Sequence, residues 1–597
     1  MSRHLTLRDT FLENRLFVNR VVVALVLAVL AGAGLATRLI YLQVMGHELY
    51  ASLSRENHVK ISPLPPTRGL IYDRNGELLA ENVPIYSLEI VPEQVPDLAQ
   101  TLQALQELLS LSDEEISRFH TLRRRNKSFE SIPVRFKLND EELARFAVRL
   151  ADFPGVSIQG RLVRRYPYGH YASHVIGYVG RITEEDLKVL DPAAYRGALH
   201  IGKTGLEKTY ETALRGRIGY EEIETNVQGR SIELVGVTPP ESGADLHLSL
   251  DIQLQKTAYD ALGEHNGALV ALDNVTGKVL ALASKPGFDP NPFVTGIDDA
   301  SYNALQNDKA QPLYHRAIRG QYPPGSTLKP FMGLAGLESG EITVNHRVYC
   351  PGYYQLPNVD HRYRDWKKYG HGSVDLATAI TESCDVYFYD LAHHLGIDRI
   401  GGFLGQFGFG AKSGIDITGE SAGLLPSRDW KRQTRNQPWF PGETLSAGIG
   451  QGYVQATPLQ LARATAILAN RGQVVTPRLV ERLETTSGEP VADPAPPSPD
   501  GKIFFQEASW NAVTHAMVEV VHGAHGTGKG ISKQLDYRMA GKTGTAQVFT
   551  VRQDEEYRES RLEEEMKDHA WFIAYAPADA PRIAVAVIAE HGGHGGT

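Results

Sequence analysis

Tyr322-Pro323-Pro324-Gly325-Ser326-Thr327-Leu328-Lys329 is the stretch from which the rest of the 597-residue chain can be interpreted. Proline and glycine mark helix starts, so the pattern predicts that Ser326 lies in the first turn of a helix continuing through residues 330–337. Residues three apart share a helix face, which places the Lys329 amine beside the Ser326 hydroxyl. A lysine whose pKa is lowered by burial or by a second cation can take the proton of a serine. Ser326 is therefore a candidate nucleophile with Lys329 as its base, although one S-x-x-K tetrad is expected by chance in a chain this long.

Two later motifs complete a pattern. Ser383-Cys384-Asp385 follows an apolar helical stretch, and Lys542-Thr543-Gly544-Thr545 leads into a strand-like segment. The sequence thus reads S-x-x-K, S-x-D, K-T-G-T, and the order S-x-x-K, S-D-N, K-T-G is the signature of class A β-lactamases and penicillin-binding proteins. On these motifs the chain resembles the class B penicillin-binding transpeptidases.

Strand-like segments flank this helical region on both sides. Residues 267–272 and 278–283 form one predicted pair, and residues 570–575 and 582–588 form another. The arrangement predicts an α+β domain that begins near residue 240, with strands from both ends meeting in one sheet. The resemblance implies the penicillin-binding transpeptidase or serine β-lactamase-like form of this fold, an antiparallel sheet flanked by helices.

The N-terminal segment is predicted to be a membrane anchor. Residues 21–37 carry no charged side chain and lie between Arg20 and Arg38, with further apolar residues on either side. About 20 apolar residues span a bilayer, and this apolar run is long for a cleaved signal peptide, which is the alternative. The predicted division is a cytoplasmic tail (1–17), a transmembrane helix (18–43), a pedestal of the dimerisation type (44–239) and a transpeptidase domain (240–597).

Charge indicates how the chain is oriented and what it does not bind. Arg3, Arg8, Arg15 and Arg20 outnumber the acidic residues before the span, which predicts a cytoplasmic N-terminus and a periplasmic remainder in the bacterial inner membrane. The whole chain carries 61 basic and 70 acidic residues, a net charge of −9, so it offers no broad electrostatic surface for nucleic acid.

The resemblance implies roles for the catalytic residues. Ser326 would attack the penultimate D-Ala carbonyl of a stem peptide and form an acyl-enzyme, with Lys329 as base. Ser383 would relay a proton to the leaving amine, and Asp385 would orient either Ser383 or Lys329. Lys542 would lower the pKa of Lys329. No cofactor is needed for this chemistry.

The resemblance also implies how the substrate is held. Lys542, Thr543 and Thr545 would bind the substrate carboxylate, and Gly544 would let the substrate strand lie against the sheet edge. The backbone N–H groups of Ser326 and Thr545 would form the oxyanion hole.

Other stretches extend the resemblance over nearly the whole chain. Arg68–Ala80, Arg165–Gly169 and Gly202–Glu207 look like family motifs of the pedestal, and Gly450-Gln451-Gly452 resembles a landmark of the catalytic domain. Members usually continue past the last strand into a helix, whereas this sequence ends at Thr597, which leaves open either truncation or absence of that helix.

Asp385, where class B members usually carry Asn, and the stretch Tyr363-Arg-Asp-Trp-Lys-Lys-Tyr-Gly370 are similar to the penicillin-binding protein 2 group, the elongation transpeptidases of rod-shaped Gram-negative cells. The resemblance implies cross-linking of stem peptides, acylation by β-lactams, and partnership with a SEDS glycosyltransferase (RodA) and an MreC-type scaffold. Two alternatives remain open: a mainly allosteric activator of the glycosyltransferase, and a β-lactam-hydrolysing enzyme, which would need a second base for deacylation.

Four potential metal ligands lie close together in the sequence. They are Cys350, Asp365, His371 and Cys384, and Cys384 is the middle residue of the S-x-D motif. Two thiolates, an imidazole and a carboxylate would suit a closed structural zinc site that fixes the loop beside the catalytic serine. A Cys350–Cys384 disulfide and two unlinked thiols are the alternatives, and the spacing does not decide among the three.

Overall fold

The computed structural model describes residues 10–41, 59–125, 128–192, 194–195, 198, 200–226, 231–492, 501–547 and 567–596. Residues 1–9 of the predicted cytoplasmic tail, residues 42–43 of the predicted anchor and residues 44–58 of the predicted pedestal lie outside these ranges. The chain divides into two compact units: residues 1–65 with 218–240, and residues 66–217 with 241–597. This division groups residues differently from the predicted domain boundaries, which stay predictions.

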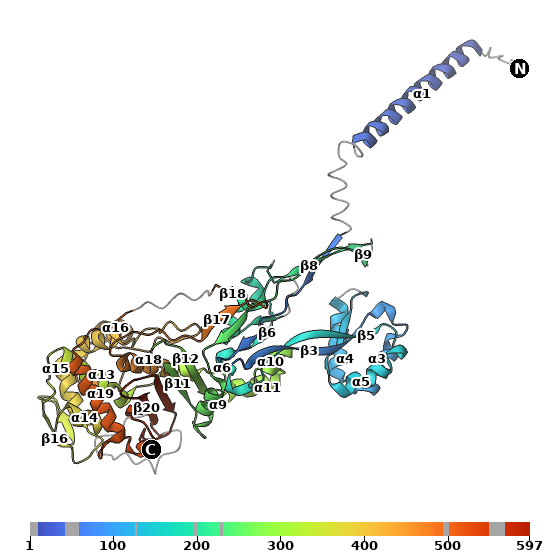
Figure 1. Ribbon diagram of the computed structural model, residues 1–597. Coiled ribbons are helices and arrows are strands. Elements are labelled where there is room, and N and C mark those ends of the chain that lie inside the picture. Colours follow the sequence, from blue (N-terminus) through green and yellow to red (C-terminus); the bar gives the residue numbers. More distant parts are fainter. Residues whose placement is uncertain are drawn as a thin grey trace. The chain divides into compact units, whose positions relative to one another are not determined.

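The first unit contains one long apolar helix and a small sheet. Helix α1 (Thr10–Ile40) includes the segment Phe17–Ile40, which is 24 residues long, has a mean hydropathy of 2.2 and is not buried anywhere in the structure (Figure 1). At about 1.5 Å per residue such a helix is about 36 Å long, enough for the ~30 Å hydrocarbon core of a bilayer. Its length and composition fit the single-pass anchor that the sequence predicts.

The sheet of the first unit is antiparallel, with the order β1-β8-β9. Its strands are β1 (Val59–Leu64), β8 (Gly219–Thr225) and β9 (Ser231–Thr238).

In the second unit, a five-stranded antiparallel sheet confirms the predicted α+β fold. The order is β12-β11-β21-β20-β19, so strands from both ends of the domain lie side by side and β19 forms an edge. The strands are β11 (Gly267–Asp273), β12 (Val279–Lys285), β19 (Ala540–Ala546), β20 (His569–Ala576) and β21 (Ile583–Ala589).

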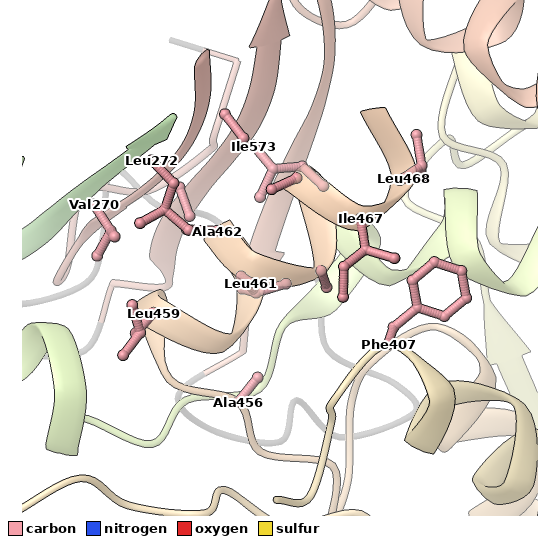
Figure 2. Packing of buried hydrophobic residues seen from close by; sticks show 14 of the residues in the cluster. Val270, Leu272, Phe407, Ala456, Leu459, Leu461, Ala462, Ile467, Leu468 and Ile573 are labelled. Carbon is pink, nitrogen blue, oxygen red and sulfur yellow. The ribbon is translucent and has the colours of Figure 1, made fainter. Parts of the chain in front are cut away.

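Side chains of β11 alternate between the two faces of this sheet, and each face packs against a different helix. Val270 and Leu272 pack against α18 (Pro458–Ala469), whose Leu459 and Ala462 lie over the same face (Figure 2). Leu269 and Ala271 point the other way, into a smaller cluster with α9 (Ile252–Asp260). Because side chains of a strand alternate between faces, both faces of β11 are covered, and its sequence is apolar from residue 267 to residue 272.

A second sheet of the same unit includes strands of the predicted pedestal. Its order is β18-β17-β10-β2-β3-β4, and β5 also pairs with β3. The strands are β2 (Ile71–Tyr72), β3 (Leu78–Ile90), β4 (Ile132–Leu138), β5 (Val156–Arg165), β10 (Asp245–Leu248), β17 (Val480–Glu484) and β18 (Pro490–Val491). Helices α3 (Leu98–Leu109), α4 (Asp113–Arg125) and α5 (Asp140–Val148) pack with β3, β4 and β5 around a separate apolar cluster.

Three of the pedestal motifs meet at one buried carboxylate. Glu207 is fully buried and accepts hydrogen bonds from Arg68 Nε at 2.6 Å and from Arg164 Nε at 2.7 Å. Tyr166 Oη donates to the same carboxylate at 3.2 Å. Burial alone would raise the pKa of Glu207, but the two guanidinium groups outweigh it and hold the pKa below its usual value. Segments far apart in the sequence are thereby joined by a compensated ion cluster.

Two buried histidines join the predicted pedestal to the predicted transpeptidase domain within the second unit. His174, on α6 (Ser173–Ile176), has its Nε2 2.9 Å from the Pro312 carbonyl oxygen, and its ring centroid is 5.2 Å from that of His315. Burial lowers the pKa of His174 to about 4. For His315, burial, then the charges of His174 and Arg319, lower the pKa well below its usual value. Both rings are neutral at pH 7.

Acidification is expected to destabilise the fold through His174. Between pH 6.5, the ordinary histidine pKa, and about 4, the unfolded chain binds a proton at His174 that the folded chain does not. The free energy of unfolding therefore falls as the pH decreases through this window, by up to about 3 kcal/mol for this group. Urea unfolding of the full chain at pH 7.5 and pH 5 should show a smaller pH dependence in His174→Gln than in the unsubstituted chain. The half-exposed His394→Gln is the control; equal pH dependence in all three chains would contradict the expectation.

Candidate active site

Ser326 lies on a 3-10 turn, η6 (Gly325–Leu328), that leads directly into α13 (Lys329–Glu338). Gly325 has a φ of +57°, and a Cβ there would lie 2.3 Å from the Thr545 carbonyl oxygen on β19. A side chain at residue 325 would therefore force the nucleophile turn away from the sheet edge. The Gly325 N–H donates to the Gly450 carbonyl at 2.8 Å, which fixes the turn from the other side. Ser326 is partly exposed, as a nucleophile must be.

The Lys329 amine is fully buried, one helical turn from Ser326. It donates to Asp385 Oδ1 at 2.7 Å, to the Ser383 carbonyl at 2.8 Å and to Ser383 Oγ at 3.3 Å. Burial raises the pKa of Asp385 more than the positive charge of Lys329 lowers it. Of the two partners that the sequence left open for Asp385, the carboxylate contacts Lys329.

Ser383 Oγ is shared between two buried amines. Lys542 Nζ donates to it at 2.9 Å and to the Thr543 carbonyl at 2.9 Å. Burial lowers the pKa of Lys542 well below its usual value, and the positive charge of Lys329 lowers it further. The Ser383 hydroxyl thus links two amines through hydrogen bonds, an arrangement that can pass a proton.

The K-T-G-T motif lies on the edge strand β19, beside the nucleophile turn. A Cβ on Gly544 would lie 2.7 Å from Thr327 Cγ2 and 3.0 Å from Trp571 Cβ, so only glycine fits between the strand and the turn. Close contact with the nucleophile turn thus gives a second reason for glycine at residue 544. The first, predicted from the sequence, is that the substrate strand can lie against the sheet edge there. Thr543 Oγ1 is 2.7 Å from Thr527 Oγ1.

Three side chains that the sequence did not assign to the site also hold it together. Gln451 Nε2 donates to the Thr545 carbonyl at 2.8 Å, and Trp571 Nε1 donates to the Pro323 carbonyl at 3.1 Å. Trp366 Nε1 donates to the Ser383 carbonyl at 3.1 Å. Gln451 belongs to the landmark Gly450-Gln451-Gly452 and Trp366 to the quoted stretch 363–370, whereas no feature of the sequence indicated that Trp571 lies at the site. All eight residues predicted for catalysis and substrate binding are brought together.

The four predicted metal ligands also form a cluster. Their ligand atoms lie within 4.8 Å of one another, and this is the one such group of His, Cys, Asp and Glu among the residues that the structure describes. Strands β13 (Val348–Cys350) and β16 (Gly372–Val374) pair Cys350 with Gly372, which brings His371 beside Cys350. Both cysteines are buried and free.

Several of the separations between these ligand atoms are those expected around a tetrahedral metal ion. Cys350 Sγ lies 3.5 Å from Asp365 Oδ2 and 3.6 Å from His371 Nδ1, and Cys384 Sγ lies 3.4 Å from Asp365 Oδ2. With Zn–S distances of about 2.3 Å and Zn–N and Zn–O distances of about 2.0 to 2.1 Å, tetrahedral ligand atoms lie about 3.3 to 3.8 Å apart. Burial raises the pKa of both thiols, so a bound cation would be needed to hold them as thiolates.

Asp365 also joins this cluster to the S-x-D motif. Its Oδ2 accepts from the N–H of Asp385 at 2.8 Å and from the N–H of Val386 at 3.2 Å, capping α15 (Asp385–Gln406). Burial would raise the pKa of Asp365, but hydrogen bonds from His371 and from the Lys367 N–H, with the charges of His371 and Lys329, lower it below its usual value. The carboxylate is therefore ionised, as both a helix cap and a metal ligand require.

Comparison with known proteins agrees with this geometry. Residues 267–597 match the family model of the penicillin binding protein transpeptidase domain, and residues 63–248 match that of the penicillin-binding protein dimerisation domain. The chain is 43% identical to the peptidoglycan D,D-transpeptidase MrdA of Acinetobacter baumannii, covering 100% of this chain and 88% of the relative. It is 42% identical to the MrdA of Escherichia coli K12, covering 98% and 93%.

Solved structures are similar as well. Pseudomonas aeruginosa PBP2 in complex with WCK 5153 gives a TM-score of 0.68 at 42% identity, over 90% of this chain and 93% of that one. Helicobacter pylori PBP2 in complex with MreC gives 0.73 at 32% identity, over 89% and 95%. A peptidoglycan synthase complex, studied for how polymerization and crosslinking are coordinated, gives 0.70 at 30% identity, over 97% and 96%. The chain belongs to the penicillin-binding protein transpeptidase family.

Proposed function

We propose that this chain is a peptidoglycan D,D-transpeptidase of the elongation type, which cross-links stem peptides through an acyl-enzyme on Ser326. The observation that carries the proposal is the position of the Ser383 hydroxyl, 3.3 Å from the Lys329 amine and 2.9 Å from the Lys542 amine, beside the turn that presents Ser326. Family membership and the names of the MrdA relatives support the same reaction.

Acylation breaks the D-Ala–D-Ala peptide bond. Ser326 Oγ attacks the carbonyl carbon of the penultimate D-Ala while the neutral form of the Lys329 amine, oriented by Asp385, takes the hydroxyl proton. The N–H groups of Ser326 and Thr545 stabilise the oxyanion, each such donor contributing roughly 3 kcal/mol. Ser383 passes a proton to the amine of the terminal D-Ala, which leaves. Lys542, Thr543 and Thr545 bind the carboxylate of that residue.

Transfer of the acyl group to a second stem peptide then follows these steps in reverse. The amine of a second stem peptide attacks the acyl carbon, loses a proton to Lys329 through Ser383, and expels Ser326 Oγ, which is reprotonated. One D-Ala is released for each cross-link formed. A β-lactam acylates Ser326 in the same way and leaves it blocked, because the opened ring keeps its leaving amine attached.

The proposal is tested by analysing peptidoglycan polymerised from a lipid-linked disaccharide pentapeptide by a SEDS glycosyltransferase, with and without the full chain. Cross-linked muropeptide dimers and released D-Ala should appear in equal amounts, and penicillin should abolish both. Glycan synthesis that is stimulated without any cross-link would instead support a purely activating role. Rapid steady-state hydrolysis of nitrocefin would support a β-lactamase.

Partners and location belong to the same proposal. The chain is anchored in the bacterial inner membrane by α1, with a cytoplasmic N-terminus and a periplasmic catalytic domain, as the excess of arginines before the span supports. It works with a SEDS glycosyltransferase of the RodA type and an MreC-type scaffold. The solved complexes of similar proteins with MreC and within a peptidoglycan synthase support these partners.

We also propose that Cys350, Asp365, His371 and Cys384 bind a structural zinc ion. Bound there, the metal would supply a closed tetrahedral clamp and no catalytic chemistry. The 3.4 to 3.6 Å separations given above and the burial of all four ligand groups support the assignment.

Removing the metal should lower stability. The purified full chain is expected to contain one zinc per molecule, and a chelator or His371→Ala should lower the melting temperature by roughly 5 to 10 °C, because the folded state loses a ligand that it binds tightly. Elemental analysis and thermal melting measure both. The exposed His361→Ala, in the same loop, is the matched control. A zinc-free chain whose melting is unaffected by chelator would refute the assignment.

A further inference from the structure

Trp366 combines an exposed ring with two hydrogen bonds to the S-x-D motif. Its side chain is 60% exposed, yet the indole Nε1 donates to the Ser383 carbonyl at 3.1 Å and to the Glu382 carbonyl at 3.2 Å. Its backbone N–H donates to Asp385 Oδ2 at 3.2 Å. An exposed tryptophan does not need buried partners for its N–H, because water can satisfy it. The hydrogen bonds from Trp366 therefore stabilise the positions of Glu382, Ser383 and Asp385 rather than that of Trp366 itself.

Ser383 is the residue that most needs to be held. It has a φ of +58°, in the left-handed region that non-glycine residues occupy only at a cost. This conformation turns its carbonyl toward Lys329 Nζ, at 2.8 Å, while its hydroxyl lies 2.9 Å from Lys542 Nζ. A return to an ordinary backbone conformation would turn the carbonyl away from Lys329. It would also move the hydroxyl out of the space between the amines.

We infer that Trp366 is a positioning residue for the acylation step: its indole N–H holds the strained Ser383 backbone so that the Ser383 hydroxyl stays between Lys329 and Lys542. The inference rests on the proposed function and adds to it a residue that acts through Ser383 rather than on the substrate. Asp365, the preceding residue, fixes the other side of the same motif by accepting from the N–H groups of Asp385 and Val386.

This role differs from that of an aromatic platform for the substrate. A platform depends on the ring and is reflected in the strength of non-covalent binding. The positioning role depends on the N–H and is reflected in the rate of the covalent step after binding. The two can therefore be separated by removing the N–H while an aromatic ring is kept.

The test uses the full chain with a fluorescent penicillin in stopped-flow acylation, which separates the dissociation constant of the non-covalent complex, Ks, from the acylation rate constant, k2. Trp366→Phe keeps an aromatic ring without a donor. Incorporation of 3-benzothienylalanine at residue 366 keeps the bicyclic ring and replaces the N–H with sulfur. Tyr369→Phe, whose side chain is 89% exposed on the same loop, is the control.

Loss of one hydrogen bond of this kind, worth about 1 kcal/mol, corresponds to roughly a fivefold fall in k2. We expect that fall in both Trp366 variants, with Ks within twofold and with unchanged melting temperature and zinc content, while Tyr369→Phe behaves as the unsubstituted chain. An unchanged k2 in the benzothienylalanine chain would overturn the inference, as would a raised Ks at constant k2. Failure of the unsubstituted chain to acylate would instead refute the proposed function. If Trp366→Phe does not fold, the benzothienylalanine chain decides alone.

Discussion

Replacing Ser326 with alanine is expected to reduce cross-linking and D-Ala release by at least roughly 10⁴-fold, because no other hydroxyl at the site can form the acyl-enzyme. Ser383 is the other serine of the catalytic motifs, but its hydroxyl is already bonded by two buried amines, and only 6% of the residue is exposed. The measurement is muropeptide analysis of peptidoglycan made in the presence of the full chain.

The same variant separates catalysis from activation of a partner. Alanine removes only an oxygen from a partly exposed position, so the fold and the pedestal should be unaffected. Ser326→Ala is therefore expected to stimulate the glycosyltransferase as well as the unsubstituted chain does. Residual cross-linking above a few per cent in a folded Ser326→Ala protein would mean that the nucleophile is a different residue.

Replacing Lys329 with methionine should lower the acylation rate by roughly 10³-fold, since general base catalysis contributes about 10² to 10⁴. The variant also leaves the Asp385 carboxylate without its cation, so some loss of stability accompanies the loss of rate. Acylation by a fluorescent penicillin and thermal melting, measured on the same preparations, report the two effects.

Lys431 provides a matched control for the cost of removing a buried lysine. Its side chain is 1% exposed and forms an ion pair with Glu443, and neither residue belongs to a catalytic motif. Lys431→Met should lose comparable stability and keep its acylation rate to within a few fold. Equal rates in the two variants would show that Lys329 is structural and not the base.

The fold was largely predictable because its strands are apolar on both faces. Leu269 and Ala271 face α9 while Val270 and Leu272 face α18, so residues 267–272 form one continuous apolar run that turn residues delimit. Such apolar runs do not indicate which strands become neighbours in the sheet. The pairing of β11 with β21, more than 300 positions along the chain, followed from fold-level reasoning about both ends of the domain.

The catalytic side chains were predictable because each belongs to a short motif whose chemistry depends on residue type. The contacts of the supporting side chains were not predictable. Trp366, Gln451 and Trp571 donate to main-chain carbonyls of Ser383, Thr545 and Pro323, and a carbonyl leaves no mark in the sequence. Such contacts are created by the tertiary fold alone. The metal cluster was partly predictable. Its four potential ligands could be identified from their residue types, but whether they lie close together depends on the pairing of β13 with β16.

The most direct test of the account is to map the acyl group. The full chain is incubated with penicillin, digested, and searched by mass spectrometry for peptides carrying the added penicilloyl group. One adduct per chain, on Ser326, is expected. An adduct on Ser383 or on any other residue, or no adduct in a folded protein, would contradict this expectation.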